Sequence, residues 1–119
     1  MKPEEPVIGI VGPCASGKST LVSDLRALGY QVRHIAQEHS YVRDMWLQIS
    51  NPDFLIYLDV TFEISRKRTD SSWSRKIFDN QIQRLEHARE HADLYIQTDD
   101  LSPRQVLVIV LDNLRVFWS

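Results

Sequence analysis

Short apolar runs alternate along the chain with stretches in which apolar residues recur every three or four positions. The runs rich in β-branched and aromatic residues predict strands over 7–11, 30–36, 54–60 and 93–98. The helical spacing predicts helices over 18–28, 41–50, 62–69 and 78–92 and a final one from 103. This alternation favours an α/β fold of three layers, in which helices cover both faces of a small parallel sheet of about four strands.

Turn and capping residues refine these bounds. Thr61 is typical of a residue that caps a helix N-terminus, and Ser102, Pro103 and Gln105 have the spacing of a capping box with proline at the first helical position. The segment 71–74 is expected to be a loop. Within 41–50, the spacing predicts one apolar face made by Val42, Met45, Trp46 and Ile49.

The chain of 119 residues is short enough for one domain. Residues 1–6 are expected to form a flexible tail, and 7–119 a single domain. Fourteen Lys and Arg against 16 Asp and Glu give a net charge of −2, which argues against nucleic-acid and membrane-surface binding. A single cysteine and an N-terminus without an apolar leader favour a cytoplasmic protein.

The segment GPCASGKST follows the first predicted strand and opens the first predicted helix. Gly12, Gly17, Lys18 and Ser19 fit the phosphate-loop pattern G-x-x-x-x-G-K-[ST] in full. Backbone N–H groups of such a loop cradle phosphates, the lysine neutralises charge on the β- and γ-phosphates, and the serine hydroxyl binds Mg²⁺. We therefore expect ATP, or another nucleoside triphosphate, and Mg²⁺ to bind at this segment, which comprises Gly12, Pro13, Cys14, Ala15, Ser16, Gly17, Lys18, Ser19 and Thr20.

A phosphate-loop protein also needs a carboxylate near the metal and a group that orients the nucleophile. Glu38 closes the second predicted strand and is a candidate metal ligand or base, and Gln37 or His39 can orient water or an acceptor hydroxyl. A polar loop is the alternative interpretation of all three. Asp59 ends a strongly apolar strand and is a second metal candidate, although a structural role at the start of the next helix is favoured.

These segments together resemble the small P-loop kinases, namely the nucleoside monophosphate kinases, including relatives of adenylate kinase, and shikimate kinase. The resemblance covers most of the chain outside 37–53 and is found in GPCASGKST, LIYLDVTFEISRKR, HADLYIQTDDLSP and the closing amphipathic helix. It implies an ATP-dependent phosphotransferase with lid arginines that close over the transferred phosphate. By motif these are Arg66 and Arg68, with Arg75 a weaker third, and 98–103 matches the segment that touches adenine.

The interval 30–53 is shorter than in these kinases, which insert an acceptor-binding region and a further strand there. Only Arg33 or Arg43 can match the acceptor-binding arginines, and the strand order is expected to be 2-1-3-4. The leading hypothesis is a kinase-like phosphotransferase acting on a small-molecule phosphoacceptor. The alternative is a nucleotide-binding module or slow NTPase that acts as a switch with a protein partner. An apolar C-terminal segment, 116–118, makes a homodimer a further expectation.

Overall fold

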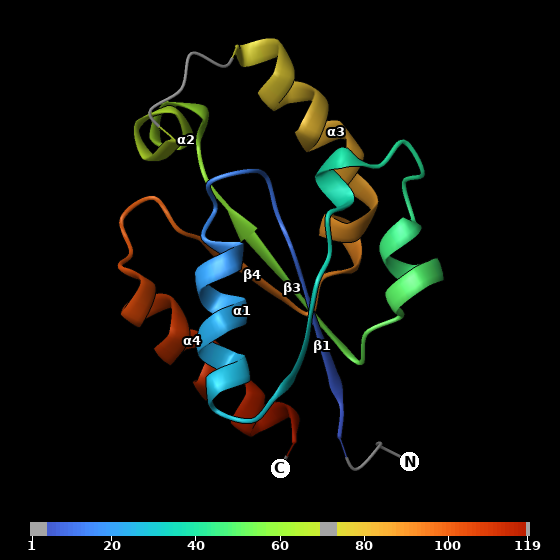
Figure 1. Ribbon diagram of the computed structural model, residues 1–119, viewed down its shortest axis with the longest axis vertical. Coiled ribbons are helices and arrows are strands. Elements are labelled where there is room, and N and C mark those ends of the chain that lie inside the picture. Colours follow the sequence, from blue (N-terminus) through green and yellow to red (C-terminus); the bar gives the residue numbers. More distant parts are fainter. Residues whose placement is uncertain (1–4, 70–73, 119) are drawn as a thin grey trace.

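Four strands form one sheet in which every neighbouring pair is parallel (Figure 1). The computed structural model describes residues 5–69 and 74–118. The strands are β1 (Val7–Val11), β2 (Gln31–His34), β3 (Phe54–Asp59) and β4 (Leu94–Gln97). Their order across the sheet is β2-β1-β3-β4. The α/β class, the four parallel strands and the expected order are thereby confirmed.

The helices lie in two layers, one on each face of the sheet. Helices α1 and α4 cover one face, and α3 covers the other together with two short helical segments, η1 and η2 (Figure 1). Helix α2 follows β3 at the carboxyl ends of the strands. The bounds are α1 (Lys18–Ala27), the 3₁₀ segment η1 (Gln37–His39), the π-helical segment η2 (Trp46–Ser50), α2 (Phe62–Thr69), α3 (Arg75–His91) and α4 (Pro103–Phe117).

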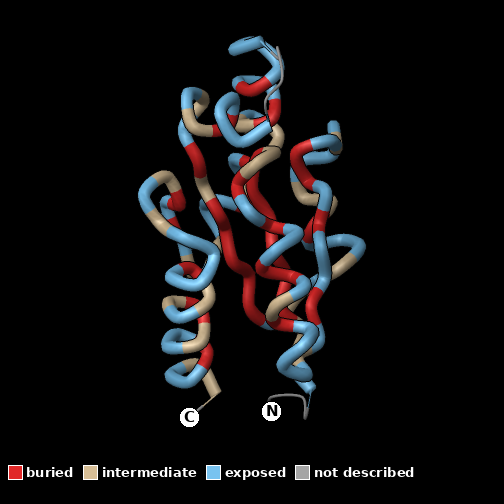
Figure 2. Tube along the Cα trace, turned by 60° about the vertical axis from the view of Figure 1, so that its left-hand side comes forward, coloured by how far each residue is buried: buried red, intermediate tan, exposed pale blue. Residues whose placement is uncertain are grey.

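Each face of the sheet has its own apolar core. Under α1 and α4, residues such as Ile10, Leu25 and Val110 are fully buried, and under α3 the core includes Tyr57 and Leu85. The strands are therefore buried on both faces, while the outer sides of the helices remain exposed (Figure 2). Each such side chain contributes about 1.5 to 3 kcal/mol by leaving water. These two cores hold the carboxyl ends of β1 and β3 in fixed positions.

The capping predictions are confirmed by hydrogen bonds. The Ser102 hydroxyl accepts the N–H of Gln105 at 3.1 Å, and the Gln105 side chain accepts the N–H of Ser102 at 2.8 Å. Thr61 Oγ1 accepts the N–H of Ile64 at 3.4 Å, as expected of an N-cap. Of the predicted loop 71–74, residues 71–73 lie outside the described residues, and Ser74 is the N-cap of α3. Most of the expected tail, residues 1–4, also lies outside them.

The segment 41–50 differs from its prediction. It forms turns followed by η2, and Trp46 is buried, whereas Val42 and Ile49 are exposed, Ile49 at 75%. The reason is the fully buried side chain of Gln37, which accepts the N–H of Trp46 at 2.9 Å and donates to the carbonyl oxygen of Val42 at 2.8 Å. These bonds replace helical ones, so the expected continuous apolar face is not formed. Within the described chain, no helix has the length and apolarity needed to cross a bilayer.

Candidate functional site

The loop between β1 and α1 has a conformation that requires glycine at two positions. A side chain at Gly12 would collide with the carbonyl oxygen of Leu58, so the loop packs directly on the β3 backbone. Gly17 and Ala15 both have positive φ, at 99° and 67°, and these angles curl the loop toward α1. Gly17 gives no side-chain cap to α1, so the first N–H groups of that helix stay available to an anion.

Lys18 and Glu38 form a buried ion pair at the base of this loop. The Lys18 ammonium donates to Glu38 Oε2 and to the carbonyl oxygen of Gly12, and lies 3.4 Å from that of Pro13. Lys18 is 6% exposed and Glu38 4%. The second carboxylate oxygen, Oε1, is buried and has no hydrogen-bond partner among the described residues. Segment η1 thus places the Glu38 carboxylate, a candidate metal ligand or base, beside Lys18 of the phosphate-loop pattern.

On the side facing α3, the loop is bonded to a buried glutamine. Gln81 is only 3% exposed, and its Oε1 accepts the N–H of Cys14 at 3.0 Å. The Gln81 amide nitrogen donates back to Cys14 Sγ at 3.2 Å. His39 Nε2 lies 3.9 Å from the same sulfur and 4.0 Å from Glu38 Oε2, and the His39 side chain is 61% exposed. Cys14 therefore has a fixed orientation between α3 and η1.

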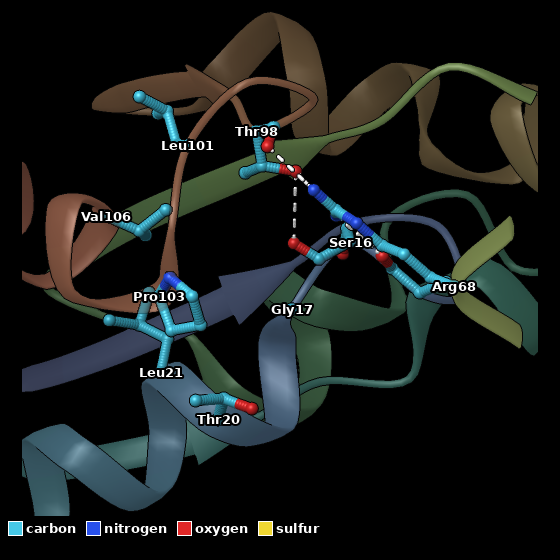
Figure 3. Close-up of a pocket in the computed structure, with 10 residues that line it drawn as sticks. Ser16, Gly17, Thr20, Leu21, Arg68, Thr98, Leu101, Pro103 and Val106 are labelled. Carbon is cyan, nitrogen blue, oxygen red and sulfur yellow. Dashed lines mark hydrogen bonds between the residues drawn. The ribbon is translucent and has the colours of Figure 1, made fainter. Parts of the chain in front are cut away.

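Arg68 reaches from α2 across the loop to the end of β4. Its guanidinium donates to the carbonyl oxygen of Ala15 at 2.9 Å, to Thr98 Oγ1 at 3.0 Å and to the Thr98 carbonyl oxygen at 2.7 Å (Figure 3). Arg66 and Arg75 instead lie over the ring of Phe62, at 5.6 and 5.3 Å from its centroid. Of the three arginines expected to form a lid, Arg68 alone contacts the loop through a described hydrogen bond.

Three cavities adjoin one another along the loop. The first, of about 260 Å³, lies between the loop, α2 and the segment 98–106 (Figure 3). The second, of about 300 Å³, surrounds the loop and includes Lys18 and Glu38. The third, of about 400 Å³, lies between the loop, η1 and α3. Residues 15–17 and Thr20 line both the first and the second cavity, and Cys14 lines both the second and the third.

The third cavity combines polar groups from α3 and η1. Asn80, Gln81, Arg84 and His39 line it, together with Ile77. The Arg84 guanidinium donates to the Glu38 carbonyl oxygen at 3.3 Å. It also lies over the ring of Tyr41, which follows η1, at 4.4 Å from the ring centroid. This cavity therefore offers a cation, an imidazole and an amide beside the loop.

The other predicted residues are placed as follows. Ser19 lines the second cavity at the start of α1. Asp59 lines none of the three cavities, because its carboxylate accepts the N–H of Val60 at 2.9 Å and the hydroxyl of Tyr95. Arg33 and Arg43 are exposed and likewise line none of them. The structure therefore brings Ser19 together with Glu38 and keeps Asp59 apart.

Sequence reasoning missed His34, at the end of β2, and the polar face of α3. His34 lines the second cavity, and burial, followed by the nearby Lys18 ammonium, lowers the pKa of its imidazole. On α3, the residues that face the loop are Ile77, Asn80, Gln81 and Arg84. Their spacing of three, four and seven places them on one helical face, which is a signal that the sequence contains.

Comparison with known proteins identifies no relative on which to base a function. The chain matches no protein-family model, and searches of curated proteins and of solved structures gave no significant match. What the site can do must therefore be derived from its own geometry and charges.

Proposed function

We propose that this chain is a Mg²⁺-dependent, ATP-binding P-loop protein, related to the small P-loop kinases, that transfers a phosphoryl group to a small molecule. The observation that supports this most is the row of three adjoining cavities along the loop. The order of these cavities along the loop matches the three parts that phosphoryl transfer needs. These are a pocket for the base, a cradle for the phosphates and a pocket for the acceptor beyond the last phosphate.

The first cavity suits a flat, apolar base. Leu21, Leu101 and Val106 line it, and the Arg68 guanidinium closes it on the side of α2 (Figure 3). A planar guanidinium stacks well on an aromatic ring. Because Arg68 is already held by Thr98 and the loop, little side-chain entropy would be lost on binding. The absence of the N-K-x-D pattern, which specifies guanine, favours ATP over GTP.

The phosphates would lie in the second cavity, against the free N–H groups at the start of α1. The Lys18 ammonium would leave Glu38 for the β- and γ-phosphates, so the buried ion pair describes the nucleotide-free state. Ser19 and Glu38 are suited to hold Mg²⁺, since both line this cavity and one buried Glu38 oxygen has no partner among the described residues. When bound, Mg²⁺ neutralises charge on the phosphate oxygens.

Transfer would begin in the third cavity. The oxygen of an acceptor hydroxyl attacks the γ-phosphorus, the bond from that phosphorus to the β–γ bridging oxygen breaks, and ADP leaves with that electron pair. The hydroxyl proton passes to a neutral His39 imidazole, which lines the third cavity beside Cys14. Lys18 stabilises the charge that develops on the transferred group.

A slow NTPase that acts as a switch with a protein partner is the second candidate. It is favoured by the exposure of His39, which leaves room for a water molecule to take the place of the acceptor. In that case the same residues would hydrolyse ATP and release inorganic phosphate. A cytoplasmic location, which keeps the Cys14 thiol reduced, and a homodimer remain predictions of the sequence.

The proposal is tested by binding of labelled ATP with and without Mg²⁺. We expect Lys18→Ala to weaken binding at least tenfold, and Ser19→Ala, which alters only an exposed hydroxyl, to remove the dependence on Mg²⁺. Lys67→Ala, at an exposed lysine of α2, is the matched control and should bind normally. Equal binding by Lys18→Ala and the unaltered protein would refute a P-loop site. Incubation with a panel of hydroxyl acceptors then separates the two candidates, because a switch NTPase yields only free phosphate.

A further inference from the structure

Three different metal-binding side chains meet where the second and third cavities adjoin. Cys14 comes from the loop, and Glu38 and His39 come from η1. One possible ligand atom from each, the sulfur, a carboxylate oxygen and an imidazole nitrogen, lies within 4.8 Å of the other two. None of the roles proposed above for phosphoryl transfer needs the Cys14 thiol. Its pairing with an imidazole and a carboxylate therefore calls for a separate explanation.

We propose that Cys14, Glu38 and His39 form an inhibitory site for a thiophilic divalent cation such as Zn²⁺. Sulfur, nitrogen and carboxylate oxygen are the ligands that Zn²⁺ takes in proteins, whereas Mg²⁺ prefers oxygen alone. Three protein ligands leave a fourth position open to water. The site itself does not depend on the proposed function; its inhibitory effect does.

An independent observation points to a cation at this place. Glu38 is buried, its Oε2 accepts from Lys18, and its Oε1 has no hydrogen-bond partner in the described part of the chain. A buried carboxylate oxygen without a donor is costly, and a cation on that oxygen would remove the cost. The carboxylate can accept from Lys18 through one oxygen and ligate a metal through the other.

The three candidate ligand atoms lie farther apart here than around a bound metal. Tetrahedral Zn²⁺, with bonds of about 2.0 Å to nitrogen or oxygen and about 2.3 Å to sulfur, holds its ligand atoms about 3.3 to 3.6 Å apart. Here His39 Nε2 is 3.9 Å from Cys14 Sγ, and the sulfur, the imidazole nitrogen and a Glu38 carboxylate oxygen all lie within 4.8 Å of one another. The ligand atoms must therefore move closer together on binding, and the largely exposed His39 side chain has room to move inward.

The charges around the site set the affinity for the metal. On binding, the thiol loses its proton to solvent and becomes a thiolate, which with Glu38 gives two negative ligands. The ammonium of Lys18 and the guanidinium of Arg84 lie against Glu38 and oppose a second cation. Affinity is therefore expected to be moderate.

Metal at this site would compete with Mg²⁺ and ATP. It occupies Glu38, which the proposed function assigns to Mg²⁺, and it lies at the boundary across which a phosphoryl group would pass. Zn²⁺ would thus block transfer without entering the base cavity. Conversely, bound MgATP would weaken the binding of Zn²⁺.

The test is a titration of the reduced full chain with Co²⁺ and Cd²⁺, whose bonds to thiolate absorb in the ultraviolet. We expect one equivalent to bind with a thiolate charge-transfer band. Cys14→Ser should abolish the band, and His39→Gln should weaken binding at least tenfold. His91→Gln is the matched control, because that exposed histidine lies at the far end of α3 and should leave the titration unchanged. A band that survives unchanged in His39→Gln, or no band at all, would overturn the site.

A second arm separates this proposal from the proposed function. Zn²⁺ affinity is measured with and without MgATP, and we expect it to fall at least tenfold when MgATP is bound. If the thiolate band forms but ATP does not bind at all, the metal site stands and the proposed function fails. If both ligands bind without affecting each other, the inhibitory role is refuted.

Discussion

Breaking the Lys18–Glu38 pair gives the sharpest test of the site, because it needs no ligand. Lys18→Met keeps the length of the side chain and removes its charge, and Glu38→Gln keeps the shape of the carboxylate and removes its charge. Each variant leaves one partner buried beside the loop without the opposite charge. The double variant Lys18→Met/Glu38→Gln leaves neither charge, so it isolates the interaction between the two.

The expected cost follows from burial and from the bonds that remain. Removing one member of a buried pair costs about 3 to 5 kcal/mol, and here the lower value applies because the pair borders an open cavity. Lys18→Met should cost about 3 kcal/mol, since Glu38 Oε1 already has no described partner. Glu38→Gln should cost about 2 kcal/mol, because the ammonium keeps the carbonyl oxygens of Gly12 and Pro13. The double variant should also cost only about 2 kcal/mol. The two single costs together exceed this value by about 3 kcal/mol, which is the coupling energy between Lys18 and Glu38.

Urea unfolding followed by circular dichroism measures these free energies. With a slope of about 2 kcal/mol per molar urea, Lys18→Met should lower the midpoint by about 1.5 M. The three variants and the unaltered chain are measured without nucleotide and without divalent metal, so that only the pair differs. Costs that add to within about 0.5 kcal/mol would refute the buried ion pair, and with it the nucleotide-free state that we describe.

Three further predictions concern single side chains around the loop. Burial and a neighbouring ammonium hold the pKa of His34 below its usual range, so phosphates bound beside it should raise that pKa. Proton uptake on ATP binding should therefore be seen by calorimetry near pH 6, in buffers of different ionisation enthalpy. The variant His34→Gln should abolish this uptake. Arg68→Ala loses three hydrogen bonds to the loop and the end of β4 and should weaken ATP binding at least tenfold by fluorescence titration, whereas Arg66→Ala should not. Gln81→Leu removes both bonds to the loop and should cost about 1 to 3 kcal/mol in urea unfolding, against less than about 0.5 kcal/mol for exposed Gln83→Leu on the same helix.

The elements that the sequence predicts well are those set by neighbouring residues. The capping box at Ser102 joins residues only three positions apart, so its geometry follows from local chemistry. The strand 54–60 is a continuous apolar run, which is what burial on both faces of a parallel sheet requires. The contact between Lys18 and Glu38 could also be predicted, because both residues follow the carboxyl ends of adjacent parallel strands.

The segment 41–50 could not be predicted in the same way. Its conformation is set by Gln37, whose side chain bonds to the backbone of Val42, Trp46 and, 47 residues away, Arg84. No periodicity in the sequence indicates that a glutamine will be fully buried and take up these groups. Helical spacing over 41–50 was therefore overridden by long-range hydrogen bonds.

Helix α3 changes where an acceptor is to be sought. The sequence directs attention to 30–53, and within it to Arg33 and Arg43, but both are exposed and line none of the three cavities along the loop. The wall beyond the loop is formed instead by residues 77–84 of α3, which bond to Cys14 through Gln81 and to the η1 backbone through Arg84. Because α3 is bonded to the loop and to η1, it can present the Arg84 guanidinium to an acceptor without any inserted region. The short interval 30–53 is thus compatible with phosphoryl transfer, because the function that an insertion would serve can be met by α3.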